Sequence, residues 1–191
     1  MRLFIAMLAS LLAACPPAPL ETHTDDSVTV EEPSPITWDE CSAALGEHAC
    51  DFTFQDQAGN DWSLYDQYGS IIVLDFSVMW CGPCQEAAWS SNSINVTSGG
   101  VTWITVLIEN LDGETPTQED GQFWGDYFGI WHNEIWLGSS ENRDYEGVSG
   151  FANTGWPYFL ILDKDLRIRI VQQGWNKEQI LQHIADLKSE L

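Results

Sequence analysis

The residues best suited to chemistry in this sequence are two cysteines separated by a Gly-Pro pair. The stretch MWCGPCQ, residues 79–85, contains Cys81 and Cys84. Two thiols at this spacing can carry out thiol–disulfide exchange, because the first thiolate attacks a partner and the second resolves the mixed disulfide. The same spacing also occurs in one half of a zinc site and in a structural disulfide.

The other cysteines and histidines do not favour a metal site. Zinc would require a second closely spaced cysteine pair or a matching pair of histidines. Eight residues separate Cys41 from Cys50, and the four histidines are scattered along the chain. A structural disulfide between Cys81 and Cys84 would close so small a loop that it would add little stability. We therefore expect a redox-active pair, with no metal and no other cofactor.

A buried strand that leads directly into a helix is expected to position this pair. Residues 70–78, SIIVLDFSV, are apolar and β-branched, as in a strand covered on both faces. Residues 84–93 could form the helix. Cys81 would then lie at the helix N-terminus, where the dipole and free N–H groups stabilise a thiolate. Cys84 would lie one turn inside, the intervening proline suits the first turn, and Trp80 can shield one side.

An acidic residue interrupts this apolar strand. Burial of Asp75 would be unfavourable unless its carboxyl is paired or shares a proton. A functional role is therefore reasonable. The alternative is that Asp75 faces water at the end of the strand.

The rest of the folded region alternates strands and helices. Around Phe52 and Phe54 we expect a β-hairpin, or a strand with a tight return, that turns at Gly59 and Asn60. A buried strand over 101–109 and a helix capped by Thr117 should follow, then strands over 157–163 and 166–174 joined by a turn at Lys164 and Asp165. The last element is a helix capped by Asn176 that places Ile180, Ile184 and Leu187 on one face. This order predicts an α/β sandwich with a mixed sheet.

Three segments are expected along the 191 residues. Residues 1–14 contain an apolar run that is too short to span a bilayer but is typical of a signal peptide. The sequence LAAC resembles the lipobox of bacterial lipoproteins, in which the cysteine, here Cys15, is lipidated; the alternative is ordinary cleavage before an unmodified Cys15. Residues 15–35, rich in Pro, Thr and acids, suit a lipidated flexible tether. Residues 36–191 form the folded domain.

The number of cysteines is odd, which requires an explanation in an exported protein. Lipidation of Cys15 would leave two pairs, Cys41 with Cys50 and Cys81 with Cys84. Export would place the domain where disulfides persist. We therefore expect a structural disulfide between Cys41 and Cys50, with two free buried thiols as the alternative.

The chain is strongly acidic. Seven Lys and Arg stand against 29 Asp and Glu, for a formal net charge of -22. Nucleic-acid binding requires a basic surface, so the charge argues against it. The charge also argues against electrostatic docking on anionic lipid, so membrane attachment would depend on the lipid at Cys15.

The stretch VLDFSVMWCGPC resembles the active-site strand and motif of the thioredoxin family, and the resemblance covers most of residues 50–191. The leader and tether look like those of membrane-tethered thiol–disulfide oxidoreductases of the TlpA/ResA type. The resemblance implies a thioredoxin-like sandwich whose mixed central sheet is flanked by helices. It also implies that Cys81 attacks, that Cys84 is the buried resolving thiol, and that Asp75 relays a proton to Cys84.

The stretch GWPYFLILD resembles the family segment that carries a cis-proline facing the active site. Pro157 matches that proline, and the backbone of Trp156 would pair with an extended substrate strand. The resemblance therefore implies a substrate-binding set of Trp80, Gly82, Pro83, Trp156 and Pro157. The alternative is a trans proline at the start of a strand.

Four positions depart from the family pattern. Trp89 replaces a frequent proline, Ala87 replaces a glutamate of many tethered members, and Gln85 replaces a basic residue. Trp156 is unusually bulky for its position. These changes bear on the substrate and the redox potential rather than on the reaction.

These observations predict an envelope protein that is lipid-anchored with its domain in the periplasm or extracytoplasmic space. Its expected activity is disulfide reduction in exported proteins that carry thiols or disulfides, with electrons from a membrane donor; the resemblance suggests cytochrome c maturation as one use. The rival hypothesis is a binding, scaffold or metal-delivery protein that uses the acidic, Trp-rich surface.

Overall fold

The computed structural model describes residues 35–131, 134–140 and 155–190. The predicted signal peptide, the lipidation of Cys15 and nearly all of the predicted tether lie outside these residues. Within the described ranges, no helix is both long enough and apolar enough to cross a membrane.

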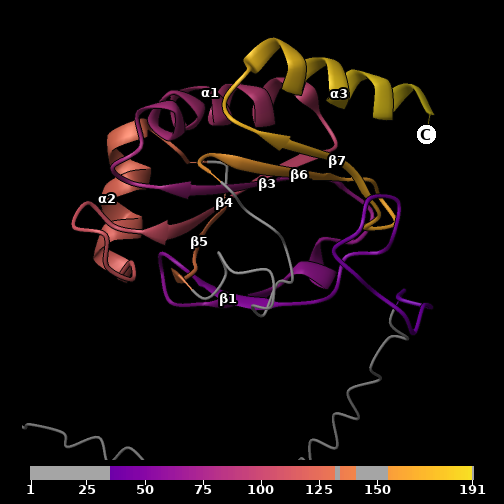
Figure 1. The fold of residues 1–191 in the computed structure, drawn as a ribbon, viewed down its shortest axis with the longest axis horizontal. Helices are drawn as coiled ribbons and strands as arrows, with labels where there is room; N and C mark the ends of the chain where they lie inside the picture. Colours follow the sequence, from indigo (N-terminus) through magenta and orange to yellow (C-terminus); the bar gives the residue numbers. More distant parts are fainter. Residues whose placement is uncertain (1–34, 132–133, 141–154, 191) are drawn as a thin grey trace, which may run out of the picture. The chain divides into compact units, whose positions relative to one another are not determined.

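A single mixed sheet forms the centre of the domain (Figure 1). Its strand order is β2-β1-β5-β4-β3-β6-β7. Strand β3 pairs in parallel with β4 and antiparallel with β6, so it lies in the interior of the sheet. The strands are β1 (Thr53–Asp56), β2 (Asp61–Ser63), β3 (Ile71–Val78), β4 (Val101–Glu109), β5 (Glu134–Leu137), β6 (Tyr158–Leu162) and β7 (Ile168–Gln173).

Helices α1 (Gly82–Ser98) and α3 (Lys177–Glu190) cover one face of this sheet (Figure 1). Alternation along β3 sends Ile71 and Val73 to this face, where they pack in one cluster with apolar residues of both helices. The alternate residues of β3, Ile72, Leu74, Phe76 and Val78, face a second cluster, to which the hairpin β1–β2 and helix α2 (Gln118–Phe128) contribute. A short 3₁₀ helix, η1 (Leu64–Gln67), follows β2.

The structure differs from the expected elements in two ways: it has one additional strand, and one helix is longer than predicted. Strand β5 was not predicted, because its four residues have no alternating pattern and it exists only by pairing with β1 and β4. Helix α1 continues to Ser98 rather than ending near residue 93. The hydroxyl groups of Ser91, Ser93 and Thr97 in its polar second half donate hydrogen bonds to carbonyl groups one turn earlier, so these polar groups are satisfied within the helix.

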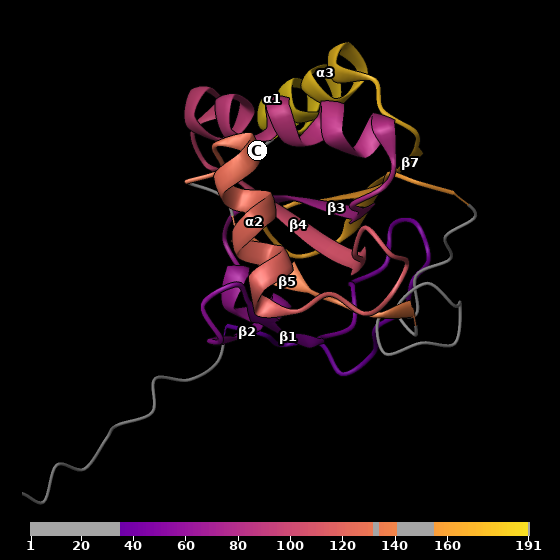
Figure 2. The same cartoon turned by 90° about the vertical axis from the view of Figure 1, so that its left-hand side faces the viewer.

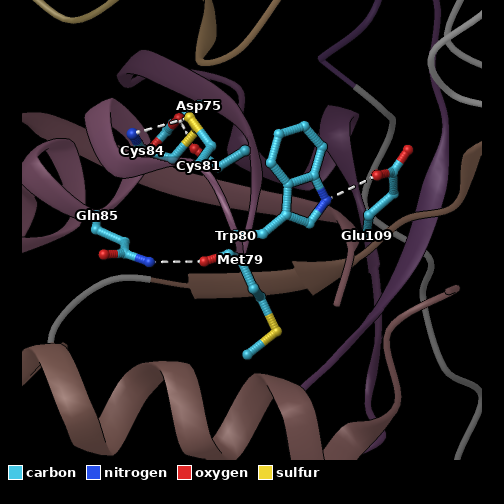
Figure 3. Close-up of a disulfide and its surroundings, with 8 residues drawn as sticks. Asp75, Met79, Trp80, Cys81, Cys84, Gln85 and Glu109 are labelled. Carbon is cyan, nitrogen blue, oxygen red and sulfur yellow. Dashed lines mark hydrogen bonds between the residues drawn. A yellow bond between two sulfur atoms is a disulfide. The ribbon is translucent and has the colours of Figure 1, made fainter. Parts of the chain in front are cut away.

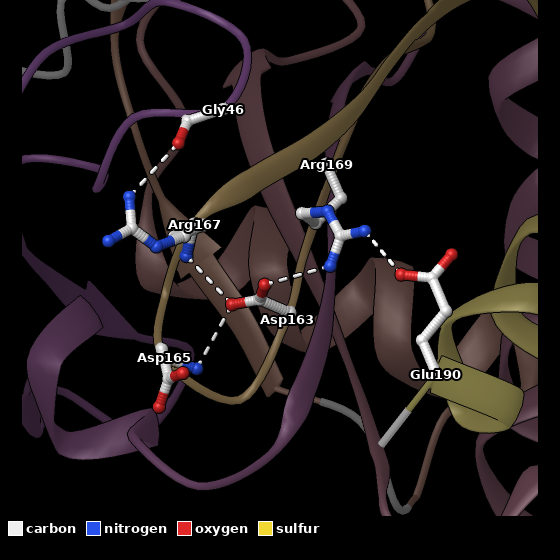
Figure 4. A network of polar contacts seen from close by, with 6 residues as sticks. All are labelled: Gly46, Asp163, Asp165, Arg167, Arg169 and Glu190. Carbon is white, nitrogen blue, oxygen red and sulfur yellow. Dashed lines mark hydrogen bonds and ion pairs between the residues drawn. The ribbon is translucent and has the colours of Figure 1, made fainter.

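A disulfide joins Cys41 to Cys50, with 4.8 Å between their Cα atoms. The loop that it closes is bonded to the start of β7: Gly46 N donates to Ile168 O at 2.7 Å and Ala49 N donates to Leu166 O at 2.9 Å. Figure 4 shows the polar contacts beside this loop. Arg167 reaches Gly46 O, and Arg169 bridges Asp163 and Glu190. The first described residues are therefore attached to the edge of the sheet.

Candidate redox site

Strand β3, a tight turn and helix α1 together place the two cysteines. Cys81 is the N-cap of α1 and Pro83 lies in its first turn. Cys81 and Cys84 form a disulfide, with their Cα atoms 5.2 Å apart. Cys84 N donates a hydrogen bond of 3.2 Å to Cys81 Sγ (Figure 3). The Cys81 sulfur thus lies where the helix dipole and a backbone N–H favour negative charge.

Backbone and side-chain hydrogen bonds hold the turn between β3 and α1. Met79 N donates to Glu109 O at 3.0 Å, and Cys81 N donates to Val78 O at 3.2 Å. The Gln85 side chain then closes the turn, because its Nε2 donates to Met79 O at 2.8 Å. Gln85, which replaces the basic residue of the family pattern, therefore has a structural role here.

The two sulfurs differ in access to solvent. Cys81 is 7% exposed, whereas Cys84 is fully buried. Gly82 and Pro83 between them are exposed. A partner disulfide can therefore approach Cys81 over this turn, while Cys84 can be reached only from inside the protein. This asymmetry suits an attacking and a resolving thiol.

Asp75 lies in the middle of β3 and is fully buried, which excludes the alternative that it faces water. It shares its face of the sheet with residues covered by α1, and its carboxyl points toward the disulfide in Figure 3. Burial raises the pKa of the Asp75 carboxyl to about 7. Such a carboxyl can accept and return a proton near neutral pH.

Polar neighbours limit the rise in this pKa. Ser77 Oγ donates a hydrogen bond of 2.6 Å to Asp75 Oδ1, and this bond favours the charged form. Trp103 and Thr105 on β4 lie close enough to lower the pKa further, but neither they nor Asp75 Oδ2 has a partner at standard hydrogen-bond geometry. The carboxyl therefore retains an oxygen available for proton exchange.

Trp80 stands beside the disulfide and is half exposed. Its Nε1 donates a hydrogen bond of 2.9 Å to Glu109 Oε2 (Figure 3). Glu109 is the last residue of β4, so the strand that neighbours β3 fixes the indole orientation. Sequence reasoning identified Trp80 but not the carboxylate that holds it.

The peptide bond between Trp156 and Pro157 is cis. These residues immediately precede Tyr158, which pairs with Phe76 near the end of β3. Pairing thus brings them to the end of the sheet where the cysteine turn begins. Trp156 is partly buried against the core, Pro157 is buried, and Pro157 O accepts a hydrogen bond of 2.8 Å from Gly174 N.

A groove of about 240 Å³ opens next to the redox pair, and sequence reasoning did not find it. We call it the aromatic groove. Helix α2 supplies most of its wall and packs on β5 (Figure 2). The residues that line it are Met79, Gln85, Leu111, Phe123, Trp124, Tyr127 and Phe128. Three elements far apart in the sequence meet here, so no local pattern predicts it.

Trp89 of α1 joins the rim of the aromatic groove. Its ring centroid lies 5.8 Å from that of Tyr127 and 5.0 Å from that of Phe128. Trp89 stands where the family pattern often has proline, and Ala87, the other departure on this helix, is fully buried. The replacement of proline thus extends the aromatic surface between α1 and α2.

The described residues do not bring together three or more His, Cys, Asp or Glu that could hold a metal ion. No family model matches the sequence. No curated protein matches it either.

Solved structures share the fold. The thioredoxin domain of a thiol-disulfide oxidoreductase from Bacteroides vulgatus has a TM-score of 0.58 at 20% identity, over 76% of this chain and 98% of that one. A DsbF homologue from Corynebacterium diphtheriae has a TM-score of 0.61 at 18% identity, over 73% and 85%. The pneumococcal exposed lipoprotein thioredoxin of Streptococcus pneumoniae has a TM-score of 0.55 at 22% identity, over 72% and 99%. The chain therefore has a thioredoxin-like α/β fold, which confirms the predicted fold class.

Proposed function

We propose that this chain is a protein thiol–disulfide oxidoreductase that reduces disulfides in exported proteins. One observation carries the proposal: a disulfide at the N-terminus of α1 in which Cys81 keeps some exposure to solvent, 7%, whereas Cys84 has none. The thioredoxin-like fold supports it, as does the similarity to a solved thiol-disulfide oxidoreductase domain.

The reaction begins with the reduced pair. The Cys81 thiolate attacks one sulfur of a partner disulfide, and the other partner sulfur leaves as a thiolate that takes up a proton. Asp75 accepts the proton of the Cys84 thiol, and the Cys84 sulfur then attacks Cys81 and releases the second partner sulfur as a thiolate. That thiolate takes up the proton that Asp75 gives back. Two electrons thus pass from the cysteine pair to the partner, which takes up two protons in all, and the Cys81–Cys84 disulfide forms. A dithiol donor, expected at the membrane, reduces the pair again.

We further propose that the domain is exported and anchored through a lipid on Cys15. The LAAC sequence after the apolar leader supports the anchor. The two disulfides of the described domain suit an oxidising compartment. One of the solved structures with this fold is described as an exposed lipoprotein.

The test is catalysis of insulin reduction by dithiothreitol, together with trapping of mixed disulfides. The wild type should accelerate insulin precipitation, and both Cys81→Ser and Cys84→Ser should abolish this turnover. Only Cys84→Ser should accumulate covalent complexes with partner proteins, because it retains the attacking thiol but cannot resolve them. The paired substitution Cys41→Ser with Cys50→Ser is the control, since it removes the other disulfide and should retain turnover.

Two results would contradict this proposal. Trapping by Cys81→Ser alone would reverse the roles of the two thiols. Absence of insulin reduction by the folded wild type would favour the rival hypothesis of a binding or metal-delivery protein. The exposed aromatic groove is the observation that favours the binding form of that hypothesis.

A further inference from the structure

The aromatic groove presents large apolar side chains to solvent beside the reactive cysteine. Leu111 is 57% exposed, Phe123 49% and Tyr127 58%, and Trp89 on the rim is 59% exposed. Exposed apolar side chains that gather into one patch mark a candidate binding surface. Met79 and Gln85, which flank the cysteine motif, line the same groove, so an occupant would lie next to Cys81.

The aromatic side chains form one connected surface. Phe123 and Tyr127, one turn apart on α2, are stacked with ring centroids 5.7 Å apart. Tyr127 also contacts Trp89 of α1. The groove volume of about 240 Å³ is below the range of about 300–1,000 Å³ typical of small-molecule sites. It therefore suits one large side chain of a protein partner better than a cofactor.

Acidic residues surround this surface. Glu119 and Asp126 are exposed on α2 and lie within one turn of Phe123. Glu86 is exposed one turn before Trp89 on α1, and Asp112 is exposed next to Leu111. No Lys or Arg occurs anywhere between Arg2 and Arg143 in the sequence. The groove is therefore apolar at its centre, with exposed acidic side chains on the elements that line it, and none of its described lining residues is Lys or Arg.

We propose that the aromatic groove binds a segment of the disulfide-bearing partner in which a large apolar side chain is flanked by Lys or Arg. The apolar side chain fills the groove, and the cations meet the acidic rim and the exposed aromatic faces through ion pairs and cation–π contacts. This inference rests on the proposed function, because it names the class of substrate that the Cys81–Cys84 pair would reduce.

The charge of the chain disfavours two other occupants. A second copy would bring another acidic rim against this one, which is repulsive. Residues 1–34 contain acids and a single cation, Arg2, so they do not match the rim either. Charge complementarity thus favours a basic partner.

The experiment compares peptides that differ only in charge. Each peptide carries one Trp and one Cys that is disulfide-linked to a chromophoric thiol, and the Trp is flanked by two Arg, two Gln or two Glu. The full chain is reduced with dithiothreitol, freed of reductant and mixed with each peptide, and release of the chromophore gives the rate. Hydroxyethyl disulfide, a small neutral disulfide, gives the reference rate for each protein variant.

The Arg peptide should react about tenfold faster than the Glu peptide at low salt, and the difference should shrink at high salt. The paired substitution Glu119→Gln with Asp126→Asn should reduce this preference. Phe123→Ser with Tyr127→Ser should lower the rate for the Arg peptide relative to hydroxyethyl disulfide. The control is Glu178→Gln with Leu181→Ser on α3, which removes one exposed acid and one exposed apolar side chain away from the groove and should retain the preference.

Equal rates for the three peptides, or a preference that the α2 substitutions leave unchanged, would overturn this inference. Concentration-dependent dimerisation of the wild type that Phe123→Ser with Tyr127→Ser abolishes would assign the groove to a second copy and also overturn it. Failure to react even with hydroxyethyl disulfide would instead count against the proposed function. Binding of Cys-free peptides, followed by NMR titration of the oxidised chain, then tests the groove by itself, and equal affinity for the Arg and Glu peptides would overturn it.

Discussion

At the scale of single residues, the site depends on the buried carboxyl of Asp75 and on Cys81, the more accessible of the two cysteines. The cysteine motif and Asp75 could be predicted from the sequence, because thiol spacing and an acid inside an apolar strand are local signals. The link between Glu109 and Trp80 could not, since it joins residues 29 positions apart through the pairing of β3 with β4. Asp75 has the clearest physical consequence, since its pKa of about 7 opposes folding at neutral pH.

The free energy of unfolding of Asp75→Asn, measured relative to that of the wild type, should be higher at pH 8 than at pH 4. An aspartate ionises near 3.8 when unfolded but near 7 in the folded protein, so the penalty is absent at low pH, grows between these values and is complete above them. The asparagine variant lacks this penalty, and its stability relative to wild type should increase by about 4 kcal/mol across the range. Urea unfolding of the oxidised protein, followed by tryptophan fluorescence, measures it.

Asp56→Asn serves as a control of opposite sign. Burial alone would raise the pKa of Asp56, but hydrogen bonds from Asn60, Trp62 and Ala58 hold it below its ordinary value. The ionised form therefore stabilises the fold above the unfolded pKa, and the loss caused by Asp56→Asn should be larger at pH 7 than at low pH. A pH-independent effect of Asp75→Asn would show that the Asp75 carboxyl has an ordinary pKa in the folded protein.

At the scale of elements, long strands and capped helices were predictable from the sequence. A short strand that depends on its neighbours, and a groove built from several elements, were not. Strands β3 and β4 have continuous apolar runs, and α2 has Thr117 bonded to Asp120 in a capping box. Strand β5 has only four residues, which pairing on both edges holds in place. The aromatic groove was missed for a related reason, because its walls come from separate elements that only the folded sheet brings together.

Helix α2 packs closely against Leu137 and Gln57 at Gly121, where the residue has no side chain. A Cβ atom at Gly121 would lie 2.9 Å from Leu137 Cδ2 and 3.0 Å from Gln57 Cβ. The Leu137 methyl can move, but the Gln57 Cβ is attached directly to the backbone. Gly121→Ala should therefore displace α2 and the groove wall that it carries.

We expect Gly121→Ala to lower the free energy of unfolding, although alanine is a better helix former by about 1 kcal/mol. Overpacking typically costs about 1–3 kcal/mol, so a net loss of up to about 2 kcal/mol should appear in urea unfolding. Gly125→Ala is the matched variant, since its Cβ would meet only the terminal Ile135 methyl at 3.1 Å and the Ile130 carbonyl oxygen at 3.7 Å. It should be tolerated better. If Gly121→Ala instead raised the free energy of unfolding by about 1 kcal/mol, as helix propensity alone would give, a Cβ atom at this position would fit without displacing α2.

At the scale of the whole molecule, charge is distributed unevenly. In the part of the chain that the structure describes, every Lys and Arg lies between residues 164 and 188, on β7, on α3 or in the turn before β7. The elements around the redox pair carry acids alone. A chain with 29 acids and seven bases repels itself, and its ion pairs, such as that of Arg169 with Asp163 and Glu190, offset little of this.

Moderate salt should therefore stabilise the protein. The Debye length falls from about 30 Å at about 0.01 M ionic strength to about 8 Å at about 0.15 M, so repulsion between separated surface acids is largely screened over this interval. If each of several like-charge contacts is unfavourable by a few tenths of a kcal/mol, the free energy of unfolding should rise by about 2 kcal/mol. Urea unfolding at neutral pH over a series of NaCl concentrations measures the rise.

Screening saturates, so most of the gain should be complete by about 0.2 M. A stability that is flat over this interval, or that rises only at molar salt as general exclusion of salt from apolar surface would produce, would show that self-repulsion does not limit this fold.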